Sequence, residues 1–288
     1  MRYLIITNPV SGGMNAEQKC SALAEAAEIL AAKIHGLDTV SAEEFRRCAA
    51  ELADQCDVLV AAGGDGTFSD IVNCIDTRRT AVGFLPLGSG NALRHGLHYK
   101  GNLAHIATRI RDGTVHRYDL IGCDEKKRAF TASVGIEGTI VRLRQKYCSQ
   151  GRKGFETYLR AVFNSYFKAY KRANGIIRVG GDTFEVENLL SLMVVKQPYY
   201  GYGMNVVPKA RFNDGKLHTL YLTTGLVTTF IAGLTAFTVG NLFGTYRSGE
   251  TLTITLDHPL VLQIDGNEGW EADSYSFRIL PRALRIKC

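Results

Sequence analysis

The sequence predicts an α/β domain followed by a β-rich domain in a chain of 288 residues. In the first 118 residues, continuous apolar runs of strand length alternate with helical patterns, which is typical of a parallel sheet covered by helices. Beyond them, short segments of period-two alternation are separated by glycine turns, which is typical of an antiparallel sandwich or barrel with inserted helices. We place the domains at 1–118 and 119–282, and we leave open that a last strand near 283–288 returns to the first domain.

The N-terminal half alternates strands with helices. Asn15 is a suitable cap for a first helix, and Ser41 with Glu44 forms a capping-box pattern at the start of a second. The expected strands are Tyr3–Thr7, Asp57–Ala62 and Ala81–Leu85. The expected helices are 15–33, 41–55, one that opens at Asp70–Ile75, and Asn91–His98.

The C-terminal half is mostly strand, with two helical interruptions. Residues 154–172 repeat apolar side chains at helical spacing, and the stretch 142–172 holds nine lysines or arginines and one acid, Glu156. Such a basic amphipathic helix either lies on a membrane surface or packs on the sheet with a solvated basic face. The expected strands are Tyr118–Cys123, Arg128–Val134, Gly175–Val179, Thr183–Val186, Leu189–Val195, Leu217–Leu222, Thr251–Leu256, Leu260–Ile264, Ser276–Leu280 and Leu284–Lys287.

The second interruption, residues 219–246, carries no charged side chain, although eight threonines and four glycines dilute its hydropathy. Because Leu217–Leu222 is expected to be a strand, about fifteen residues remain for a helix, which is short for a membrane span. We expect a core helix here rather than a transmembrane helix, with partial insertion or lipid contact as the alternative.

Composition narrows the class of partner. A net charge of +6 suits an anionic partner such as a membrane surface, a nucleic acid or a nucleotide. No recognised nucleic-acid motif accompanies the basic stretch, so we expect no nucleic-acid partner. The seven cysteines include no CxxC pair, which disfavours a zinc site or a disulfide framework and favours a reducing, cytoplasmic compartment.

The motif Gly63-Gly64-Asp65-Gly66-Thr67 stands directly after a buried strand and before a helix. Backbone N–H groups at such a turn bind phosphate, and the helix dipole favours an anion. Asp65 is unsuited to bare phosphate, but it suits a Mg²⁺ ligand or an acceptor for the proton of an attacking hydroxyl. A tight turn with a capping aspartate is the structural alternative.

Two further glycine turns follow strands in the same half, at residues 8–13 and 86–91. Because the carboxyl ends of parallel strands share one edge of the sheet, we expect the three loops to line one crevice. The patterns GxxxxGK[S/T] and GxGxxG are both missing from the sequence, which disfavours the Walker-type ATPases and the dinucleotide-binding enzymes.

In this order, NPVSGG, GGDGT and PLGSGNAL resemble the catalytic domain shared by diacylglycerol kinases, sphingosine kinases and their bacterial lipid-kinase relatives. The stretch Tyr200–Leu217 and Asp265-Gly266 resemble later motifs of that family, so the resemblance covers the whole chain. GGDGT also recurs in the more distant NAD kinases. The resemblance implies a nucleotide-binding α/β domain, a β-rich lipid-substrate domain, and the use of ATP and Mg²⁺.

The resemblance also implies functional residues, position by position. Asp65 would lie beside the transferred phosphate, and Asp119 would support a magnesium–water network. Asp214, with the carbonyls of Leu217 and Thr219, would hold a structural Mg²⁺; without the resemblance, Asp214-Gly215 is typical of a hairpin turn. The implied ATP contacts are Asn8, Pro9, Ser11, Gly12, Gly63, Gly64, Asp65, Gly66, Thr67, Asp70, Gly88, Ser89 and Asn91.

The proton acceptor is left open. The family's late motif is Asp-Gly-Glu, with the Glu as proposed base, whereas here Asn267 separates Asp265-Gly266 from Glu268. One step along an extended segment reverses the direction of the side chain. Either Glu268 reaches the site through a bulge, or Asp265 or Asp65 accepts the proton.

The activity that the resemblance implies is transfer of the γ-phosphoryl group of ATP to a lipid hydroxyl. The third loop, GSGNAL, is closer to the sphingosine kinase form than to Gly-Thr-x-Asn-Asp, which favours a sphingoid or ceramide-like alcohol over diacylglycerol. We expect peripheral contact with the anionic inner face of the membrane, and we leave a homodimer open. The alternatives are an NAD kinase-like kinase of a soluble alcohol, which segments 142–172 and 219–246 disfavour, and a catalytically silent nucleotide- or lipid-binding regulator.

Overall fold

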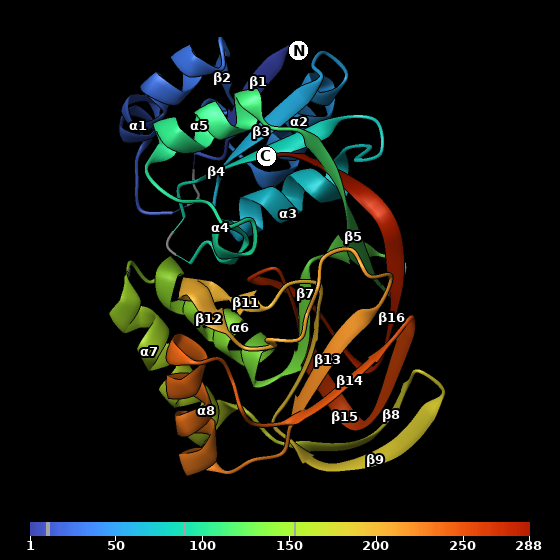
Figure 1. Ribbon diagram of the computed structural model, residues 1–288. Coiled ribbons are helices and arrows are strands. Elements are labelled where there is room, and N and C mark those ends of the chain that lie inside the picture. The colour runs from blue at the N-terminus through green and yellow to red at the C-terminus, as the bar shows by residue number, and fades with distance from the viewer. Residues whose placement is uncertain (10–11, 89, 153) are drawn as a thin grey trace. The chain divides into compact units, whose positions relative to one another are not determined.

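A computed structural model describes residues 1–9, 12–88, 90–152 and 154–288. The chain divides into two compact units, each described here by itself (Figure 1). Unit 1 comprises Met1–Asp119, Gly201–Gly203 and Pro281–Cys288, and unit 2 comprises Leu120–Tyr200 and Met204–Leu280. Parallel strands in unit 1 and antiparallel strands in unit 2 confirm the predicted fold class.

Unit 1 is built on parallel strands in the order β2-β1-β3-β4, followed by the end of β16, where Ile286 lies opposite Val82. The strands are fully buried apolar runs, as expected for a parallel sheet with helices on both faces. The strands are β1 (Tyr3–Thr7), β2 (Ile34–His35), β3 (Val58–Gly63) and β4 (Ala81–Pro86). The helices are α1 (Ala16–Ile29), α2 (Ala42–Ala53), α3 (Asp65–Cys74), α4 (Ala92–Gly96), α5 (Leu103–Asp112) and the short 3-10 turn η2 (Gly201–Gly203).

Local sequence signals set the helix boundaries in unit 1. The side chain of Asn15 accepts the N–H of Gln18 and begins α1, and that of Ser41 accepts the N–H of Glu44 and begins α2. The first helix ends at Ile29 rather than at 33, because Ala31 takes a left-handed conformation with φ 47°. The third begins at Asp65, earlier than expected, so that the glycine turn is itself the helix N-terminus.

Unit 2 is an antiparallel assembly in the order β14-β13-β10-β7-β15-β16. Strand β15 is long: its first part pairs with β8 and its later part with β7, which folds the strands around one apolar core. Two expected strands at 276–280 and 284–287 are parts of the single strand β16, because no turn separates them. The strands are β5 (Val115–Cys123), β6 (Lys127–Ala129), β7 (Thr131–Gly135), β8 (Ala173–Val179), β9 (Asp182–Leu189), β10 (Ser191–Val195), β11 (Tyr199–Tyr200), β12 (Met204–Asn205), β13 (Leu217–Leu222), β14 (Thr245–Gly249), β15 (Thr251–Ile264) and β16 (Asn267–Lys287).

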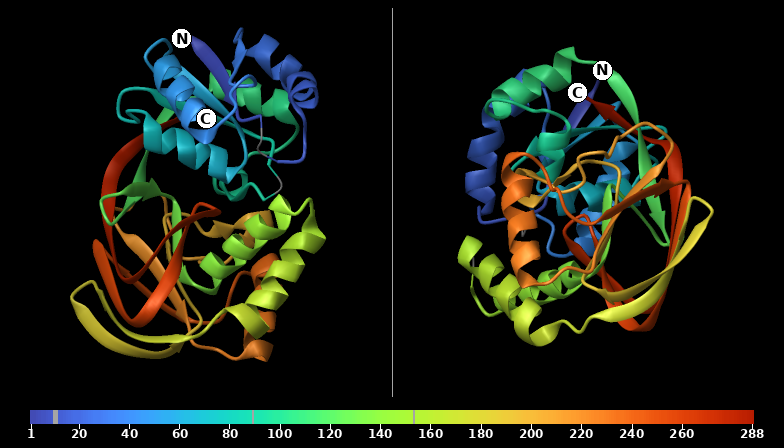
Figure 2. Two further views of the ribbon diagram at one scale, coloured as in Figure 1. Left: turned by 180° about the vertical axis from the view of Figure 1, so that it is seen from behind. Right: turned by 60° about the horizontal axis from the view of Figure 1, so that its bottom comes forward.

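Helices gather on one side of the strands of unit 2 (Figures 1 and 2). The expected helix at 154–172 is α7 (Phe155–Asn164) continued by a π-helical turn, η1 (Ser165–Ala169), and the uncharged segment contains α8 (Leu226–Thr238). The sequence analysis missed α6 (Ile136–Ser149). In the described part of the chain, no helix has both the length and the apolar character needed to cross a bilayer.

Candidate active site

The structure brings the three glycine loops of unit 1 together. The N–H groups of Leu87 and Gly88 donate to the carbonyl of Gly63, at 2.8 and 3.2 Å. A Cβ on Gly88 would lie 2.5 Å from the Cα of Gly64, and one on Gly12 would lie 3.8 Å from the carbonyl oxygen of Leu87. Backbone therefore meets backbone where the second and third loops touch, and only glycine permits that approach.

Asp65 lies at the centre of this contact. Its two oxygens accept the N–H groups of Ala92 and Leu93, at 2.8 and 3.0 Å, and so cap the start of α4. Burial raises the pKa of the Asp65 carboxyl, while the two backbone donors oppose the rise. Each carboxylate oxygen keeps a further lone pair, so Asp65 is a capping group with acceptor capacity to spare.

Asn91 adds a second oxygen to the same place. It takes a left-handed conformation, donates to the carbonyl of Gly88 at 2.5 Å, and is buried. Within the described residues its Oδ1 has no hydrogen-bond partner, and a Cβ on Gly88 would lie 2.8 Å from that oxygen. An orphaned acceptor beside Asp65 suits the donors of a bound nucleotide or the water shell of its Mg²⁺.

A buried lysine that the sequence analysis missed holds the first loop. The ammonium of Lys19, on α1, donates to the carbonyls of Asn8 and Pro9 at 2.5 and 2.9 Å. Burial lowers the pKa of Lys19, and its side chain is almost fully covered. Helical spacing placed Lys19 on α1, but only the fold shows that it turns toward the loop rather than toward water.

The remaining predicted contacts lie around the same loops. Thr67 is buried in the first turn of α3, where a Cβ on Gly63 would lie 2.6 Å from its Cβ, and Asp70 is half-buried one turn further. Gly66 lies between Asp65 and Thr67 in that turn. Ser11 and Ser89 lie outside the described residues.

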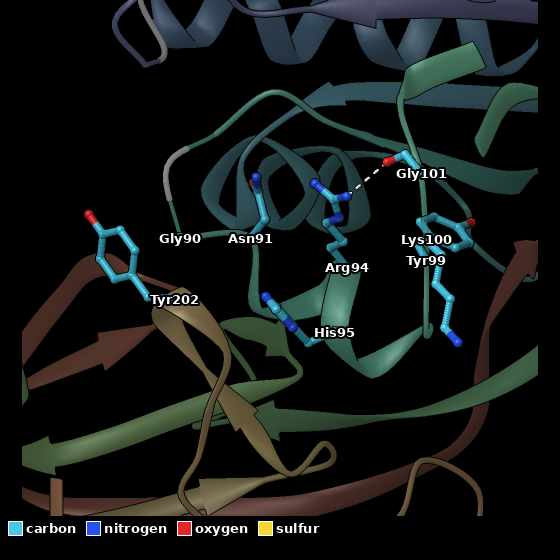
Figure 3. Close-up of a pocket in the computed structure, with 8 residues that line it drawn as sticks. All are labelled: Gly90, Asn91, Arg94, His95, Tyr99, Lys100, Gly101 and Tyr202. Carbon is cyan, nitrogen blue, oxygen red and sulfur yellow. Dashed lines mark hydrogen bonds between the residues drawn. The ribbon is translucent and has the colours of Figure 1, made fainter. Parts of the chain in front are cut away.

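A cavity of about 540 Å³ opens beside the third loop within unit 1 (Figure 3). Arg94 and His95 come from α4, and Arg94 donates to the carbonyl of Gly101 at 2.9 Å. Burial lowers the pKa of His95. The cavity is lined by Gly90, Asn91, Arg94, His95, Tyr99, Lys100, Gly101 and Tyr202. This lining includes three basic side chains and no acid. The sequence analysis missed this basic wall, although Arg94 and His95 directly follow the third motif.

The other acids predicted for catalysis have structural partners. Asp119 is buried in β5 and accepts the N–H of Arg282 at 2.9 Å. In unit 2, Asp265 begins a two-residue hairpin turn with Gly266, both at positive φ, and its Oδ1 accepts the N–H and hydroxyl of Thr131 at 2.8 and 3.1 Å.

Glu268, just past that turn, is held in an ion pair. Its Oε1 lies 2.7 Å from the Nε of Arg142 on α6, and a second nitrogen of Arg142 lies 2.9 Å from Glu271. A register shift of the β-bulge kind does lie between Glu268 and Glu271, opposite Val261 and Gln263 of β15. Glu268 is thus engaged by the guanidinium of Arg142 on α6.

Glu137, the second residue of α6, is a buried acid that the sequence analysis did not single out. Its Oε1 accepts the hydroxyl of Ser191 at 2.7 Å, and within the described residues its Oε2 has no partner. Burial raises the pKa of Glu137 to about 7, against the opposing hydrogen bond from Ser191. The partner comes from a strand 54 residues away, so no local pattern reveals this site.

The acid expected to hold a structural Mg²⁺ is already engaged. The ammonium of Lys196, which is fully buried, lies 2.7 Å from Oδ1 of Asp214 and donates to the carbonyl of Lys216 at 2.6 Å. Nε2 of His218 lies 2.9 Å from Oδ2, and Thr219 lies in β13, which is paired on both sides. This donor set does not fit a divalent cation, because a fixed positive charge occupies the coordinating oxygen. In the described part of the chain, no cluster of three or more His, Cys, Asp or Glu side chains is arranged to hold a metal ion.

Comparisons with known proteins agree on one family. Residues 2–123 match the family model described as diacylglycerol kinase catalytic domain, and residues 131–288 match the YegS C-terminal NAD kinase beta sandwich-like domain. The diacylglycerol kinase of Staphylococcus saprophyticus is 25% identical over 175 residues, which are 58% of this chain and 54% of that protein. That of Staphylococcus aureus strain Newman is 25% identical over 167 residues, 55% of this chain and 50% of that protein. The chain thus spans about half the length of the curated relatives it matches.

Solved structures share the fold over the whole chain. A candidate diacylglycerol kinase from Bacillus anthracis strain Sterne has a TM-score of 0.79 at 18% identity, covering 99% of this chain and 96% of that one. A diacylglycerol kinase structure from the same strain has a TM-score of 0.73 at 16% identity with the same coverage. At these identities the likeness shows the fold alone.

Proposed function

Because the chain belongs to the family that carries the diacylglycerol kinase catalytic domain, we propose that it is an ATP-dependent lipid kinase. It transfers the γ-phosphoryl group of ATP to the hydroxyl of a lipid. The observation that supports this most strongly is the backbone contact between Gly64 and Gly88, which gathers loop N–H groups, Asp65 and Asn91 at one place.

Phosphoryl transfer needs positioning and charge neutralisation more than covalent help. The phosphates of ATP suit the N–H groups of the loops and the N-terminus of α3. The N-cap residue of α3 is Gly64, which has no side chain to cap the helix. Mg²⁺ would neutralise charge on those phosphates, with Asp119 as the unit 1 acid that would support its water shell. Lys19 fixes the first loop through the carbonyls of Asn8 and Pro9.

Of the three acids left open as base, we assign the proton transfer to Asp65. Asp65 lies among the glycine loops, whereas in unit 2 Asp265 accepts hydrogen bonds from Phe130 and Thr131 and Glu268 pairs with Arg142. Burial raises the pKa of Asp65, which favours proton acceptance, since general-base efficiency rises as the pKa approaches the working pH.

The acceptor is a diacylglycerol, a sphingoid base or a ceramide-like alcohol. The curated relatives are named diacylglycerol kinases, whereas the GSGNAL loop favours the sphingoid form. A lipid acceptor places the enzyme in the cytoplasm at the inner face of the membrane, where the basic stretch 142–172 meets anionic headgroups.

The test is phosphorylation of diacylglycerol or sphingosine in mixed micelles with labelled ATP and Mg²⁺, comparing wild type with Asp65→Asn. We expect a loss of on the order of 100-fold or more in rate, as is typical when a positioned proton acceptor is removed. Asp54→Asn, an exposed acid paired with Arg79, is the matched control and should keep full rate. Unchanged transfer by Asp65→Asn, in protein that still melts cooperatively, would refute the assignment.

A further inference from the structure

Exposed apolar side chains are concentrated on unit 2. Among the described residues, eleven of the fourteen large hydrophobic side chains that are exposed belong to α7, η1, α8 and the loop after α8. We call these eleven the apolar surface: Leu159, Phe163, Phe167, Leu226, Val227, Phe230, Ile231, Leu234, Phe237, Val239 and Leu242. A patch of this size on a single chain marks an interaction site.

Both helices expose their large apolar side chains and bury small residues, which is the opposite of an ordinary surface helix. In α8, the six large apolar side chains are 41–71% exposed, whereas the small residues Ala232 and Ala236 are buried. In α7 and η1, Leu159, Phe163 and Phe167 follow one another at four-residue steps and are 51–60% exposed, whereas Ala161 and Ser165 are fully buried. A helix that served only the core would turn its large side chains inward.

The two helices lie on the same side of unit 2 in both views (Figures 1 and 2). A direct link joins them: Arg172, just after η1, donates to the carbonyls of Thr223 and Thr224, just before α8, at 3.1 and 2.6 Å. The rings of Phe163 and Phe167 are 4.5 Å apart at their centroids, which holds two exposed aromatics in a fixed pair. Hydrogen bonds therefore tie the segment that carries the α7 part of the patch to the start of the α8 part.

Exposed charge beside the α7 part of the patch is mostly positive. Arg152, Arg160, Lys168 and Lys171 are exposed beside the α7 part, against one exposed acid, Glu156. Segment 219–246, which contains α8, has no charge at all. An apolar face with a basic fringe complements a bilayer surface that carries anionic headgroups.

We propose that the apolar surface docks this chain on an anionic phospholipid bilayer, with α8 and α7 lying in the interface plane and their large side chains inserted among the lipids. The inference rests on the proposed function, because a lipid acceptor must be reached in the membrane. A second copy of the chain fits less well, since a two-fold contact through this surface would bring the basic fringes of both copies together.

The test is sedimentation with vesicles of phosphatidylcholine alone or mixed with phosphatidylglycerol. Phe230→Gln with Phe237→Gln should weaken binding to the mixed vesicles on the order of 100-fold, about tenfold for each phenylalanine removed from lipid. The matched control is Val40→Gln, an exposed apolar residue of unit 1, which should bind as wild type does. Lys168→Glu with Lys171→Glu should weaken binding at low salt only, whereas Arg46→Glu with Arg47→Glu should not.

Separate outcomes decide the inference and the function on which it rests. If wild type phosphorylates lipid in vesicles and the double Phe variant does so equally well while binding as tightly, the inference is wrong and the kinase stands. If wild type binds vesicles through this surface but labels no lipid, the kinase fails and the docking surface stands. If the double Phe variant instead converts a dimer into a monomer in light scattering, the occupant is a second copy. Activity on a water-soluble short-chain diacylglycerol should be equal in all variants.

Discussion

Substituting Lys196 with methionine tests the interpretation of the Asp214 cluster. Methionine keeps the length of the buried stem but removes the ammonium that lies 2.7 Å from Asp214 and 2.6 Å from the carbonyl of Lys216. Removing one partner of a buried ion pair costs about 3–5 kcal/mol, and we expect about 3 kcal/mol because the Asp214 side chain is 32% exposed and keeps some water. For a unit of this size that loss lowers the melting temperature by roughly 6–12 °C.

The assay is thermal unfolding with EDTA or with Mg²⁺. Wild type should melt at the same temperature in both, since Lys196 supplies the positive charge at Oδ1 of Asp214. Lys196→Met should be stabilised by Mg²⁺, because Asp214 and the carbonyl of Lys216 are then open oxygen ligands. Adding Asp214→Asn to Lys196→Met should restore much of the lost stability and remove the Mg²⁺ effect. A wild type that Mg²⁺ stabilises strongly, or a single variant as stable as wild type, would refute the reasoning.

Three further changes follow from the site geometry. Folding raises the pKa of Glu137 from 4.5 to about 7, so the folded state holds a proton that the unfolded state releases. The stabilisation that this proton contributes is fully present below pH 4.5 and is lost as the pH rises toward 7. Above pH 7 the free energy of unfolding is lower by on the order of 3 kcal/mol. Glu137→Gln should therefore raise the melting temperature at pH 8 and leave it unchanged at pH 4.5, and an equal gain at both values would contradict the assignment. Gly88→Ala should weaken ATP binding at least tenfold in calorimetry, because its Cβ would lie 2.5 Å from Gly64, whereas Gly233→Ala on α8, which has open space and no positive φ, should not. Lys19→Met should weaken ATP binding with little effect on lipid-vesicle binding, since it releases the carbonyls of Asn8 and Pro9; unchanged nucleotide affinity would show that this contact is not needed.

The sequence predicts the fold class and the meeting of the three loops because both depend on local signals. Buried apolar runs identify parallel strands, and glycine turns at their ends must share an edge of the sheet. The partners of the acids depend on residues far apart in the chain, and no local pattern contains them. Lys196 reaches Asp214 across 18 residues, and Asp265 is held by residues more than 130 positions away.

The apolar stripe of residues 154–172 shows a different kind of limit. Its period predicts a helix, but the sequence alone does not show which part of the stripe turns inward. The fold packs α7 against α6, buries the small residues Ala161 and Ser165, and leaves Phe163 and Phe167 of the stripe exposed. Contact of this helix with a membrane stays a prediction.

The central claim is transfer of phosphate to a lipid hydroxyl, and one screen tests it most directly. Purified protein with Mg²⁺ and labelled ATP is incubated with micelles of diacylglycerol, sphingosine, ceramide or phosphatidylglycerol, beside NAD and a sample without acceptor. We predict label in one lipid, lost in Asp65→Asn and kept in Asp54→Asn. Label in NAD alone would assign the chain to the kinases of soluble alcohols, and no label from protein that binds ATP would show a catalytically silent regulator.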